Sequence, residues 1–287
     1  MLGYYHSSTA RILSLNKSMP VNNAAFVGSI PENYDRYLGH VLFDPYAADL
    51  VARLDLPENA EVLELACGTG IVTRRLRDRL GPKARLVATD LNEAMLGYAG
   101  MKFSPEDAVE WKQADATELP FADQSFDAVV CQFGLMFFPD KERAVREAFR
   151  VLRPGGTLTF SVWDAIERND LPHIAHEVIS KFFEDNPPDF YDIPFSFHDS
   201  EVIKALVSAA GFRQIQVSLL PLEAISLSAR DAAKGLVHGN SVITAIRERD
   251  ESKVPEIEAD VAAAVAAQCG DKPVRGRMQA LICSAIR

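Results

Sequence analysis

The segment at residues 64–70, with the sequence ELACGTG, combines residue types that could bind a charged small molecule. It follows an apolar run at 62–65 and precedes residues 71–80, whose apolar side chains have helical spacing. A glycine-containing turn before a helix N-terminus presents free backbone N–H groups to an anionic ligand. However, Thr73 replaces the third glycine of the dinucleotide-binding fingerprint, and no Gly-Lys-Ser/Thr sequence follows. A pyrophosphate is therefore disfavoured as the ligand.

Two carboxylates refine this prediction. Glu64 stands near the end of the predicted strand, where its negative charge would repel phosphate but suits a ligand that carries both an ammonium and a carboxylate group. Asp90 lies 20 residues beyond Gly70, at the end of the next predicted strand, where a carboxylate can accept hydrogen bonds from ribose hydroxyls. Together they predict a nucleoside joined to an amino acid.

The elements that would position these residues alternate between strand and helix. Amphipathic helices are predicted between several apolar segments, for example at 140–152, where Ala144, Val145 and Ala148 form an apolar stripe. This alternation predicts an α/β fold, in which a Rossmann-like, doubly wound, mostly parallel sheet carries helices on both faces. The predicted strands of this part are 61–66, 85–90, 108–113, 126–133 and 157–163.

The rest of the chain is expected to extend this unit. Residues 1–44 are predicted to be a leader and an N-terminal cap, with Met19 as an alternative native start. Residues 165–200 combine a predicted helix with the Pro- and aromatic-rich sequence NPPDFYDIPFSFHD, which predicts a helical lid over a pocket. Residues 201–287 are expected to complete a seven-stranded sheet, with helices inserted at about 229–269 between its last two strands.

Four stretches in the proper order resemble the class I S-adenosylmethionine-dependent methyltransferases, especially the branch of ubiquinone and menaquinone biosynthesis methyltransferases: VLELACGTG, VATDLNEAML, QADATELPFADQSFDAVVCQFGLMFF and REAFRVLRPGGTLTFSVWD. The resemblance runs from about Tyr34 to Trp163 and continues more loosely to the end. It departs at Ala66, where the loop often has its first glycine, a replacement common in this branch. The resemblance implies S-adenosyl-L-methionine as the cofactor and residues 45–164 as its binding core, with Tyr34 of YDRY as a residue that closes over it.

The resemblance also implies which residues contact the methionine part of the cofactor. Glu64 would face the ammonium group, directly or through water. Ala66, Gly68 and Gly70 would let the backbone approach the methionine. Gln132, at the end of the fourth predicted strand, would border the methionine and the transferred methyl group.

The nucleoside part has its own implied set of contacts. Asp90 would hold the ribose hydroxyls, with Leu91 and Met95 against the adenine face. Asp115 would accept a hydrogen bond from the adenine amino group, and the Ala116 N–H would meet a ring nitrogen.

Methyl transfer from a sulfonium is an in-line displacement, so the enzyme mainly holds acceptor and methyl in position and excludes water. A general base is needed only where the acceptor must lose a proton. The candidate bases are His173, His176, His198 and His238. His173 and His176 lie three residues apart on one helix face, but no motif supplies a third ligand, and no metal is predicted.

Aromatic side chains concentrate outside the predicted cofactor core, which suits a pocket for a small hydrophobic or aromatic acceptor. An interface between the subunits of a homodimer would also account for them, and both explanations stay open. The residues are Phe26, Tyr34, Tyr37 and Phe43 before the core, and Phe182, Phe183, Phe190, Tyr191, Phe195 and Phe197 after it.

Composition narrows the class of partner. The net charge of −10 disfavours nucleic acid, no apolar run reaches membrane-spanning length, and the four cysteines form no C-x-x-C pair, as expected in a reducing cytoplasm. We therefore predict a cytoplasmic methyltransferase that acts on oxygen or carbon of a small molecule. The alternatives are a regulatory protein that binds the cofactor without turnover, and an NAD-dependent oxidoreductase on a similar sheet.

Overall fold

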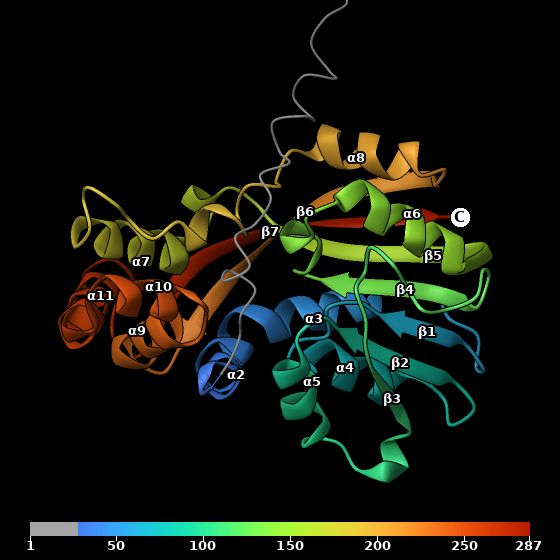
Figure 1. Cartoon of the computed structure of the whole chain (residues 1–287), viewed down its shortest axis with the longest axis horizontal. Helices are drawn as coiled ribbons and strands as arrows, with labels where there is room; N and C mark the ends of the chain where they lie inside the picture. The colour runs from blue at the N-terminus through green and yellow to red at the C-terminus, as the bar shows by residue number, and fades with distance from the viewer. Residues whose placement is uncertain (1–27) are drawn as a thin grey trace, which may run out of the picture.

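Residues 28–287, which the computed structural model of the chain describes, form a seven-stranded sheet flanked by helices (Figure 1). The strand order is β3-β2-β1-β4-β5-β7-β6. Neighbouring strands from β3 to β5 run parallel, whereas β7 is antiparallel to both β5 and β6. The predicted seven-stranded, mostly parallel sheet is therefore confirmed. The strands are β1 (Glu61–Glu64), β2 (Arg85–Asp90), β3 (Val109–Gln113), β4 (Phe126–Gln132), β5 (Leu152–Trp163), β6 (Arg213–Ser226) and β7 (Val274–Ile286).

The central strands are buried because helices cover the sheet on both faces. Along β4, Ala128, Val129 and Val130 are fully buried, as the nearly continuous apolar sequence predicts for a central parallel strand. One face carries α3, which packs against α4, and the other carries α6 and α8, which contact each other. The helices of these layers are α3 (Asp44–Ala52), α4 (Ile71–Arg79), α5 (Glu93–Gly100), α6 (Lys141–Val151) and α8 (Ser200–Ala209).

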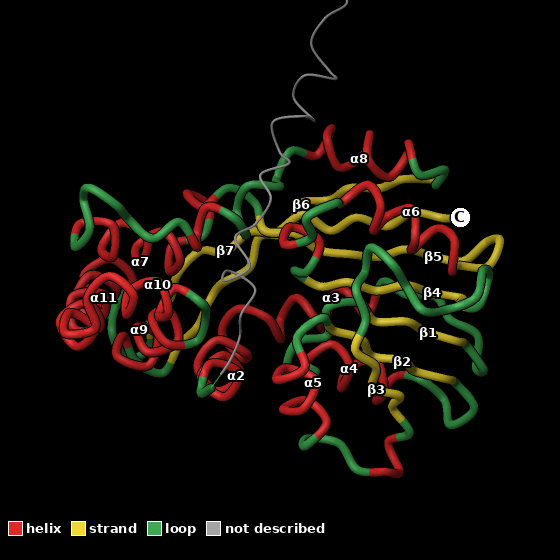
Figure 2. Tube along the Cα trace, viewed as in Figure 1, coloured by secondary structure: helices red, strands yellow, loops and turns green. Residues whose placement is uncertain are grey.

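A second group of helices lies beyond the carboxyl ends of the parallel strands, at the left of Figures 1 and 2. We call it the helical body. It unites the predicted lid with the predicted insertion, because α11 packs on both α9 and α7. The long strands β6 and β7 extend from the sheet into this body, and β7 contacts α7 and α11. Its helices are α7 (Asp170–Lys181), α9 (Ala229–His238), α10 (Val242–Asp250) and α11 (Val254–Cys269).

The N-terminal cap begins with α2 (Ile30–Asn33) and continues as η2 (Tyr34–Phe43), a π-helix that packs on α3 and α9. The predicted leader, with Met19 and the aromatic Phe26, lies outside the described residues. Among the described residues there are also five 3₁₀ turns: η3 (Pro105–Asp107), η4 (Leu135–Phe137), η5 (Ile166–Arg168), η6 (Phe190–Asp192) and η7 (Glu251–Lys253).

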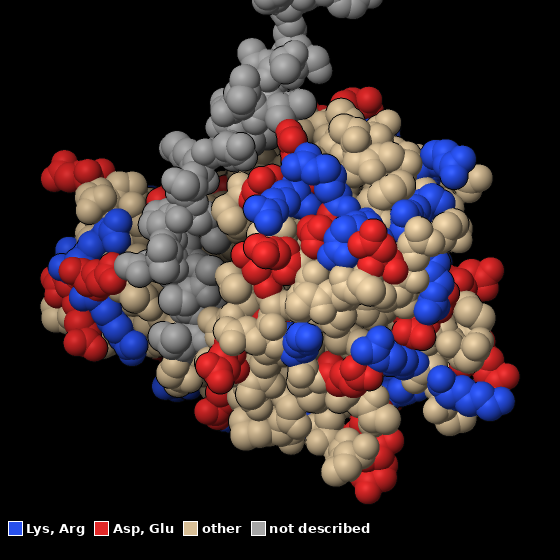
Figure 3. Space-filling view, turned by 45° about the vertical axis from the view of Figure 1, so that its right-hand side comes forward, with Lys and Arg blue, Asp and Glu red and all other residues tan. Residues whose placement is uncertain are grey.

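The surface carries both signs of charge. On the face shown in Figure 3, Lys and Arg side chains are interspersed with Asp and Glu. Within residues 28–287, no helix is both long and apolar enough to cross a membrane.

Candidate functional site

A cavity of about 500 Å³ opens beyond the carboxyl ends of the parallel strands, between η2 and the helical body. Open α/β sheets bind their ligands at this edge. Of the residues predicted to contact a cofactor, Glu64 and Gly70 do not contribute to the cavity wall. The others do: Tyr34, Ala66, Gly68, Asp90, Leu91, Met95, Asp115, Ala116 and Gln132.

The loop after β1 has a left-handed backbone at three positions. Ala66, Gly68 and Gly70 have φ angles of 52°, 55° and 82°. This conformation explains why related loops often have glycine where this chain has Ala66, since a Cβ makes it less favourable. At Gly70 a side chain would also meet Phe103 at 3.1 Å, so this glycine is required for packing.

Asp90 connects the loop to the next helix. Its Oδ2 accepts a hydrogen bond from the Gly68 N–H at 2.9 Å, and its Oδ1 accepts one from the Asn92 N–H at 2.8 Å. Burial raises the pKa of this carboxyl group, and the backbone hydrogen bonds oppose that shift. The carboxyl group is therefore held in one orientation at the cavity wall.

Glu64 lies behind the loop and is 1% exposed. Burial raises its pKa to about 8, the charge of Asp90 adds to this shift, and a hydrogen bond donated by Thr73 Oγ1 at 2.6 Å opposes it. Thr73 occupies the position of the third glycine in the dinucleotide fingerprint. The departure from that fingerprint thus supplies the hydrogen-bond partner of the buried carboxyl group.

We expect Glu64 to make stability depend on pH. A group whose pKa rises from about 4.5 to about 8 on folding stabilises the protein fully below pH 4.5, and this contribution is lost as the pH rises to about 8. The slope is about 1.4 kcal/mol per pH unit within this window. Glu64→Gln keeps an oxygen for Thr73 but cannot titrate, so urea unfolding at pH 5, 6.5 and 8 should show a shallower loss than in the wild type. Equal slopes in the two proteins would contradict this expectation.

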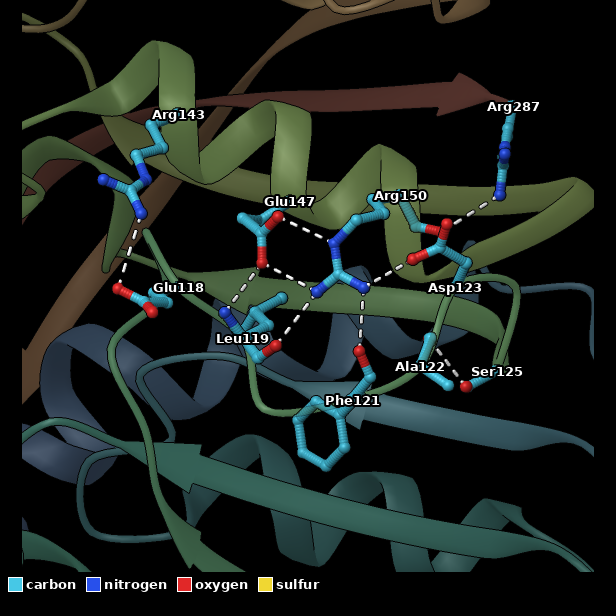
Figure 4. A network of polar contacts seen from close by, with 10 residues as sticks. All are labelled: Glu118, Leu119, Phe121, Ala122, Asp123, Ser125, Arg143, Glu147, Arg150 and Arg287. Carbon is cyan, nitrogen blue, oxygen red and sulfur yellow. Dashed lines mark hydrogen bonds and ion pairs between the residues drawn. The ribbon is translucent and has the colours of Figure 1, made fainter.

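The loop between β3 and β4 carries Asp115 and Ala116 to the cavity wall. Asp115 Oδ1 accepts hydrogen bonds from the Thr117 N–H and Oγ1, at 2.8 and 2.7 Å. Farther along, Arg150 of α6 donates to the carbonyls of Leu119 and Phe121, at 2.9 and 2.8 Å (Figure 4). These hydrogen bonds attach the loop to α6.

Glu147 of α6 also forms hydrogen bonds with this loop and with Arg150. Its carboxylate accepts two hydrogen bonds from Arg150 and one from the Leu119 N–H, each at 2.8 Å (Figure 4). The hydrogen bonds from Arg150 lower the pKa of Glu147, so the carboxylate stays charged at neutral pH. Arg150 also reaches Asp123 at 2.8 Å.

Replacing Arg150 with methionine is therefore expected to weaken cofactor binding about tenfold and to destabilise the protein by about 2 kcal/mol, because several charged hydrogen bonds are lost. Arg143→Met is the matched control. Arg143 reaches Glu118 of the same loop at 3.4 Å, but both side chains are exposed, and such a pair contributes little. Calorimetric titration with S-adenosylhomocysteine measures both variants, and equal affinities would contradict the prediction.

The cap lies beside α5, which α2 contacts. The Tyr34 ring stacks on Phe43, with centroids 4.6 Å apart, and burial raises its pKa, with Asp90 and Asp35 adding to the shift. Asp35 accepts a hydrogen bond from Lys102 at 2.6 Å and one from Tyr98 OH at 3.5 Å. The cap is thus attached beside the loop that Asp90 orients.

Gln132 and Gly134 form the wall at the end of β4. Gln132 Nε2 donates to the Phe43 carbonyl at 3.1 Å, which fixes the amide orientation because a carbonyl can only accept. Its Oε1 is buried and has no hydrogen-bond partner among the described residues. A Cβ on Gly134 would come within 2.5 Å of Ala66 Cβ, so the two loops are in close contact.

Most of the remaining wall is apolar and aromatic. The predicted aromatic residues Phe43, Phe190, Tyr191 and Phe195 take part in it together with Tyr34, whereas Tyr37, Phe182, Phe183 and Phe197 do not. The sequence analysis missed Phe133, Phe137, Phe138 and Trp163. Their positions at or just after the carboxyl ends of β4 and β5 were the available signal.

Two polar residues of the helical body also reach the cavity. Tyr191 OH donates to the Leu236 carbonyl at 2.8 Å. Asn240 Nδ2 donates to the same carbonyl at 3.0 Å and to Tyr191 OH at 3.4 Å. These hydrogen bonds join the predicted lid to α9.

The candidate bases lie outside the wall that the described residues form. Each has a carboxylate nearby: His173 is 3.6 Å from Glu177, His176 4.0 Å from Asp192, His198 4.0 Å from Asp164 and His238 2.9 Å from Glu258. Their role as general bases stays a prediction. Residues 28–287 contain no group of three or more His, Cys, Asp or Glu side chains that could hold a metal ion.

Fold and cavity together define a Rossmann-like protein with a carboxylate-lined crevice next to an apolar chamber. Residues 63–160 match the family described as "Methyltransferase domain". The chain is 34% identical over 176 residues to the ubiquinone/menaquinone biosynthesis C-methyltransferase UbiE of Proteus mirabilis, covering 55% of this chain and 68% of that protein. It is 42% identical over 103 residues to a 2-phytyl-1,4-naphtoquinone methyltransferase of Thermosynechococcus vestitus, covering 36% of this chain and 46% of that protein.

Solved structures agree with this fold. A putative methyltransferase from Bacillus halodurans is 22% identical with a TM-score of 0.55, and the match covers 84% of this chain and 97% of that chain. A Haemonchus contortus phosphoethanolamine methyltransferase in complex with S-adenosylhomocysteine is 15% identical with a TM-score of 0.58, and the match covers 95% of this chain and 59% of that chain. The chain belongs to the S-adenosylmethionine-dependent methyltransferase family that includes the ubiquinone and menaquinone C-methyltransferases. This confirms the predicted enzyme class and cofactor in preference to an NAD-dependent oxidoreductase.

Proposed function

We propose that this enzyme transfers the methyl group of S-adenosylmethionine to a ring carbon of a small hydrophobic quinol. The supporting observation is the mixed wall of the cavity: the carboxylates Asp90 and Asp115 line one part, and aromatic and apolar side chains line most of the rest. A quinol ring with an apolar tail matches the second part. One relative reported above is named for ubiquinone and menaquinone biosynthesis, and the other is named as a 2-phytyl-1,4-naphtoquinone methyltransferase.

The cofactor contacts follow from the same cavity wall. We propose that Asp90 accepts hydrogen bonds from the ribose hydroxyls and that Leu91 and Met95 contact the adenine. Asp115 and the Ala116 N–H would bind the adenine edge. The preset orientation of the Asp90 carboxyl group supports this assignment, because an acceptor already held in place loses little entropy on binding.

The methionine part would lie between the loop after β1 and the end of β4. We propose that Gln132 Oε1 accepts a hydrogen bond from the methionine ammonium group, since a buried acceptor without a partner is costly. Ala66 and Gly68 would allow the backbone to approach. Glu64 lies behind the cavity wall and would act on the ammonium group through water. The positive charge of the bound ammonium would lower the raised pKa of Glu64 and so favour its charged form.

The cofactor supplies an electrophilic methyl group on a positively charged sulfur. The chain's own contribution is to hold the acceptor in line and to exclude water, which the apolar walls on the cap, the sheet edge and the helical body can do together. If the acceptor releases a proton, a general base would take it up. The candidates for this base include His173, His176 and His198.

We also propose a cytoplasmic enzyme with a small-molecule partner and no nucleic-acid partner. Four free cysteines and the acidic composition support this.

A homodimer interface was the other explanation for the aromatic side chains outside the cofactor core. Of these side chains, Phe190, Tyr191, Phe195 and Phe197 are buried within the chain itself. For Phe190, Tyr191 and Phe195, which also line the cavity, the acceptor pocket is therefore the better explanation.

The test is methyl transfer from isotope-labelled S-adenosylmethionine to 2-polyprenyl-1,4-naphthoquinol and 2-polyprenyl-benzoquinol. We expect the label on a ring carbon, identified by mass spectrometry and NMR. Label on a quinol oxygen would overturn the proposed carbon specificity. Absence of label from both quinols, in a protein that binds S-adenosylhomocysteine, would overturn the proposed acceptor class.

A further inference from the structure

A cluster of aromatic rings occupies the cavity wall where β4 and β5 end. Phe133 stacks on Trp163 with ring centroids 3.8 Å apart and planes inclined by 6°. Tyr46 lies 5.3 Å from both rings, and Phe43 lies 5.8 and 6.0 Å from them. A ring that is equally distant from two stacked rings lies beside the stack. Tyr46 and Phe43 therefore support the edges of the Phe133–Trp163 pair rather than its outer faces.

The backbone at Phe133 is strained. Its φ of 51° is in the left-handed region, which bulky residues rarely adopt. The position is imposed by the sheet, because the Phe133 N–H donates to the Ser161 carbonyl at 3.0 Å, one strand away. Such strain persists where the surrounding structure enforces it, and it concentrates at functional sites. Here its effect is to lay the Phe133 ring flat against Trp163.

The lid contributes a further ring to the same wall. Phe195 lies 6.1 Å from Trp163 with an interplanar angle of 31°, and both residues line the cavity. On the cap side, the Tyr34 ring stacks on Phe43, and the charge of Asp90 contributes to the raised pKa of Tyr34. Ring contacts thus run along the wall from the carboxylate part of the cavity to the lid.

We propose that the Phe133–Trp163 pair is the platform on which the acceptor stacks, and that Phe133 is a specificity-determining residue for planar aromatic rings. Stacked and tilted rings favour a flat aromatic acceptor over a flexible acyclic one, because the π-faces gain from an additional parallel ring. The proposal rests on the proposed function only in that the acceptor is a hydrophobic ring compound.

Tryptophan fluorescence tests the platform by direct binding. The chain contains two tryptophans, and Trp111 on β3 is not part of the cavity wall. In Trp111→Phe, Trp163 is the only tryptophan. We expect its fluorescence, excited selectively over tyrosine, to show saturable quenching by 2,3-dimethyl-1,4-naphthoquinone, whose quinone ring has no free position for thiols. In Trp163→Phe, the quenching should be weak and linear. Equal quenching in both variants, or no saturable quenching in Trp111→Phe, would overturn the platform.

Substitutions of Phe133 distinguish the effect of its ring from the effect of its backbone conformation. Phe133→Gly removes the ring and suits the left-handed φ, whereas Phe133→Leu keeps apolar volume without a π-face. We expect both variants to raise the KM for the naphthoquinol at least tenfold and to leave the Kd for S-adenosylhomocysteine within twofold. An unchanged KM in both would overturn the assignment of Phe133.

Failure of the platform is distinguishable from failure of the proposed acceptor class. Saturable quenching of Trp163 with no methylated quinol would retain the platform and remove the quinol as substrate. Methylated quinol with unchanged KM in the Phe133 variants would retain the reaction and remove the platform. A geraniol control, acyclic and apolar, should not displace the naphthoquinone at equal concentration, and displacement by geraniol would contradict ring selection.

Discussion

Asp90→Ala is expected to weaken the binding of S-adenosylhomocysteine about 100-fold. A hydrogen bond that a charged carboxylate accepts contributes about 1.5–3 kcal/mol, and each 1.4 kcal/mol changes a dissociation constant tenfold. The variant also removes the carboxyl oxygens that accept hydrogen bonds from the N–H groups of Gly68 and Asn92, at 2.9 and 2.8 Å. The loop after β1 would therefore lose part of its preset geometry. Isothermal titration calorimetry gives the affinity directly.

Two further variants identify the cause of that loss. Asp90→Asn keeps one acceptor oxygen and should lose less affinity than Asp90→Ala. Asp78→Ala removes an exposed carboxylate of α4 that pairs with Arg74, and its affinity should match the wild type. If Asp90→Ala binds within twofold of the wild type, Asp90 does not contact the ribose.

Gly134→Ala is expected to destabilise the protein by about 3 kcal/mol and to abolish measurable methyl transfer. Its φ of −100° suits any residue, so the cost is steric. The new Cβ would lie 2.5 Å from Ala66 Cβ and 2.9 Å from Cys131 Sγ, and a Cβ cannot rotate away. Overpacking of this kind costs about 1–3 kcal/mol and here displaces the cofactor loop. Denaturant unfolding and a methyl-transfer assay measure the two effects.

A second substitution should partly reverse the first. Ala66→Gly removes the atom that causes the shortest contact, and it suits the left-handed φ of 52° at that position. The double variant should therefore regain stability relative to Gly134→Ala. Gly97→Ala in α5 is the control, because a Cβ there meets nothing within 4 Å and helix propensity favours alanine by about 1 kcal/mol. Equal destabilisation by both glycine substitutions would contradict the steric explanation.

The sequence predicted the cofactor part of the site well because its determinants are local. The turn after β1, the carboxylate at the end of β2 and the loop after β3 each depend on short segments whose strands end at one edge of a parallel sheet. Loop chemistry and spacing along the chain were therefore enough to predict that Gly68 and Asp90 share one site, and the family resemblance added Asp115; all three line the same cavity. Glu64 was predicted to face the ligand, and its burial behind Thr73 depends on how α4 packs against β1.

The acceptor part of the site was predicted only as a concentration of aromatic residues. Phe190 and Tyr191 reach the cavity, whereas Phe182 and Phe183, from the same segment, lie beside the cationic side chains Arg249 and Lys253. Composition cannot separate these groups, because the direction of each ring depends on which helix packs against it.

By itself, the sequence determined the α/β class and the number of strands, because hydrophobic periodicity and loop chemistry act over a few residues, and its resemblance to known methyltransferases indicated the family. It also predicted several of the polar residues that line the cavity. Tertiary structure alone decided that the lid and the late helices form one body on the extended β6 and β7, and that Phe133 is laid flat on Trp163. Both depend on contacts between segments far apart in the chain. The energy of such contacts comes from burial in the folded molecule, which local sequence patterns do not record.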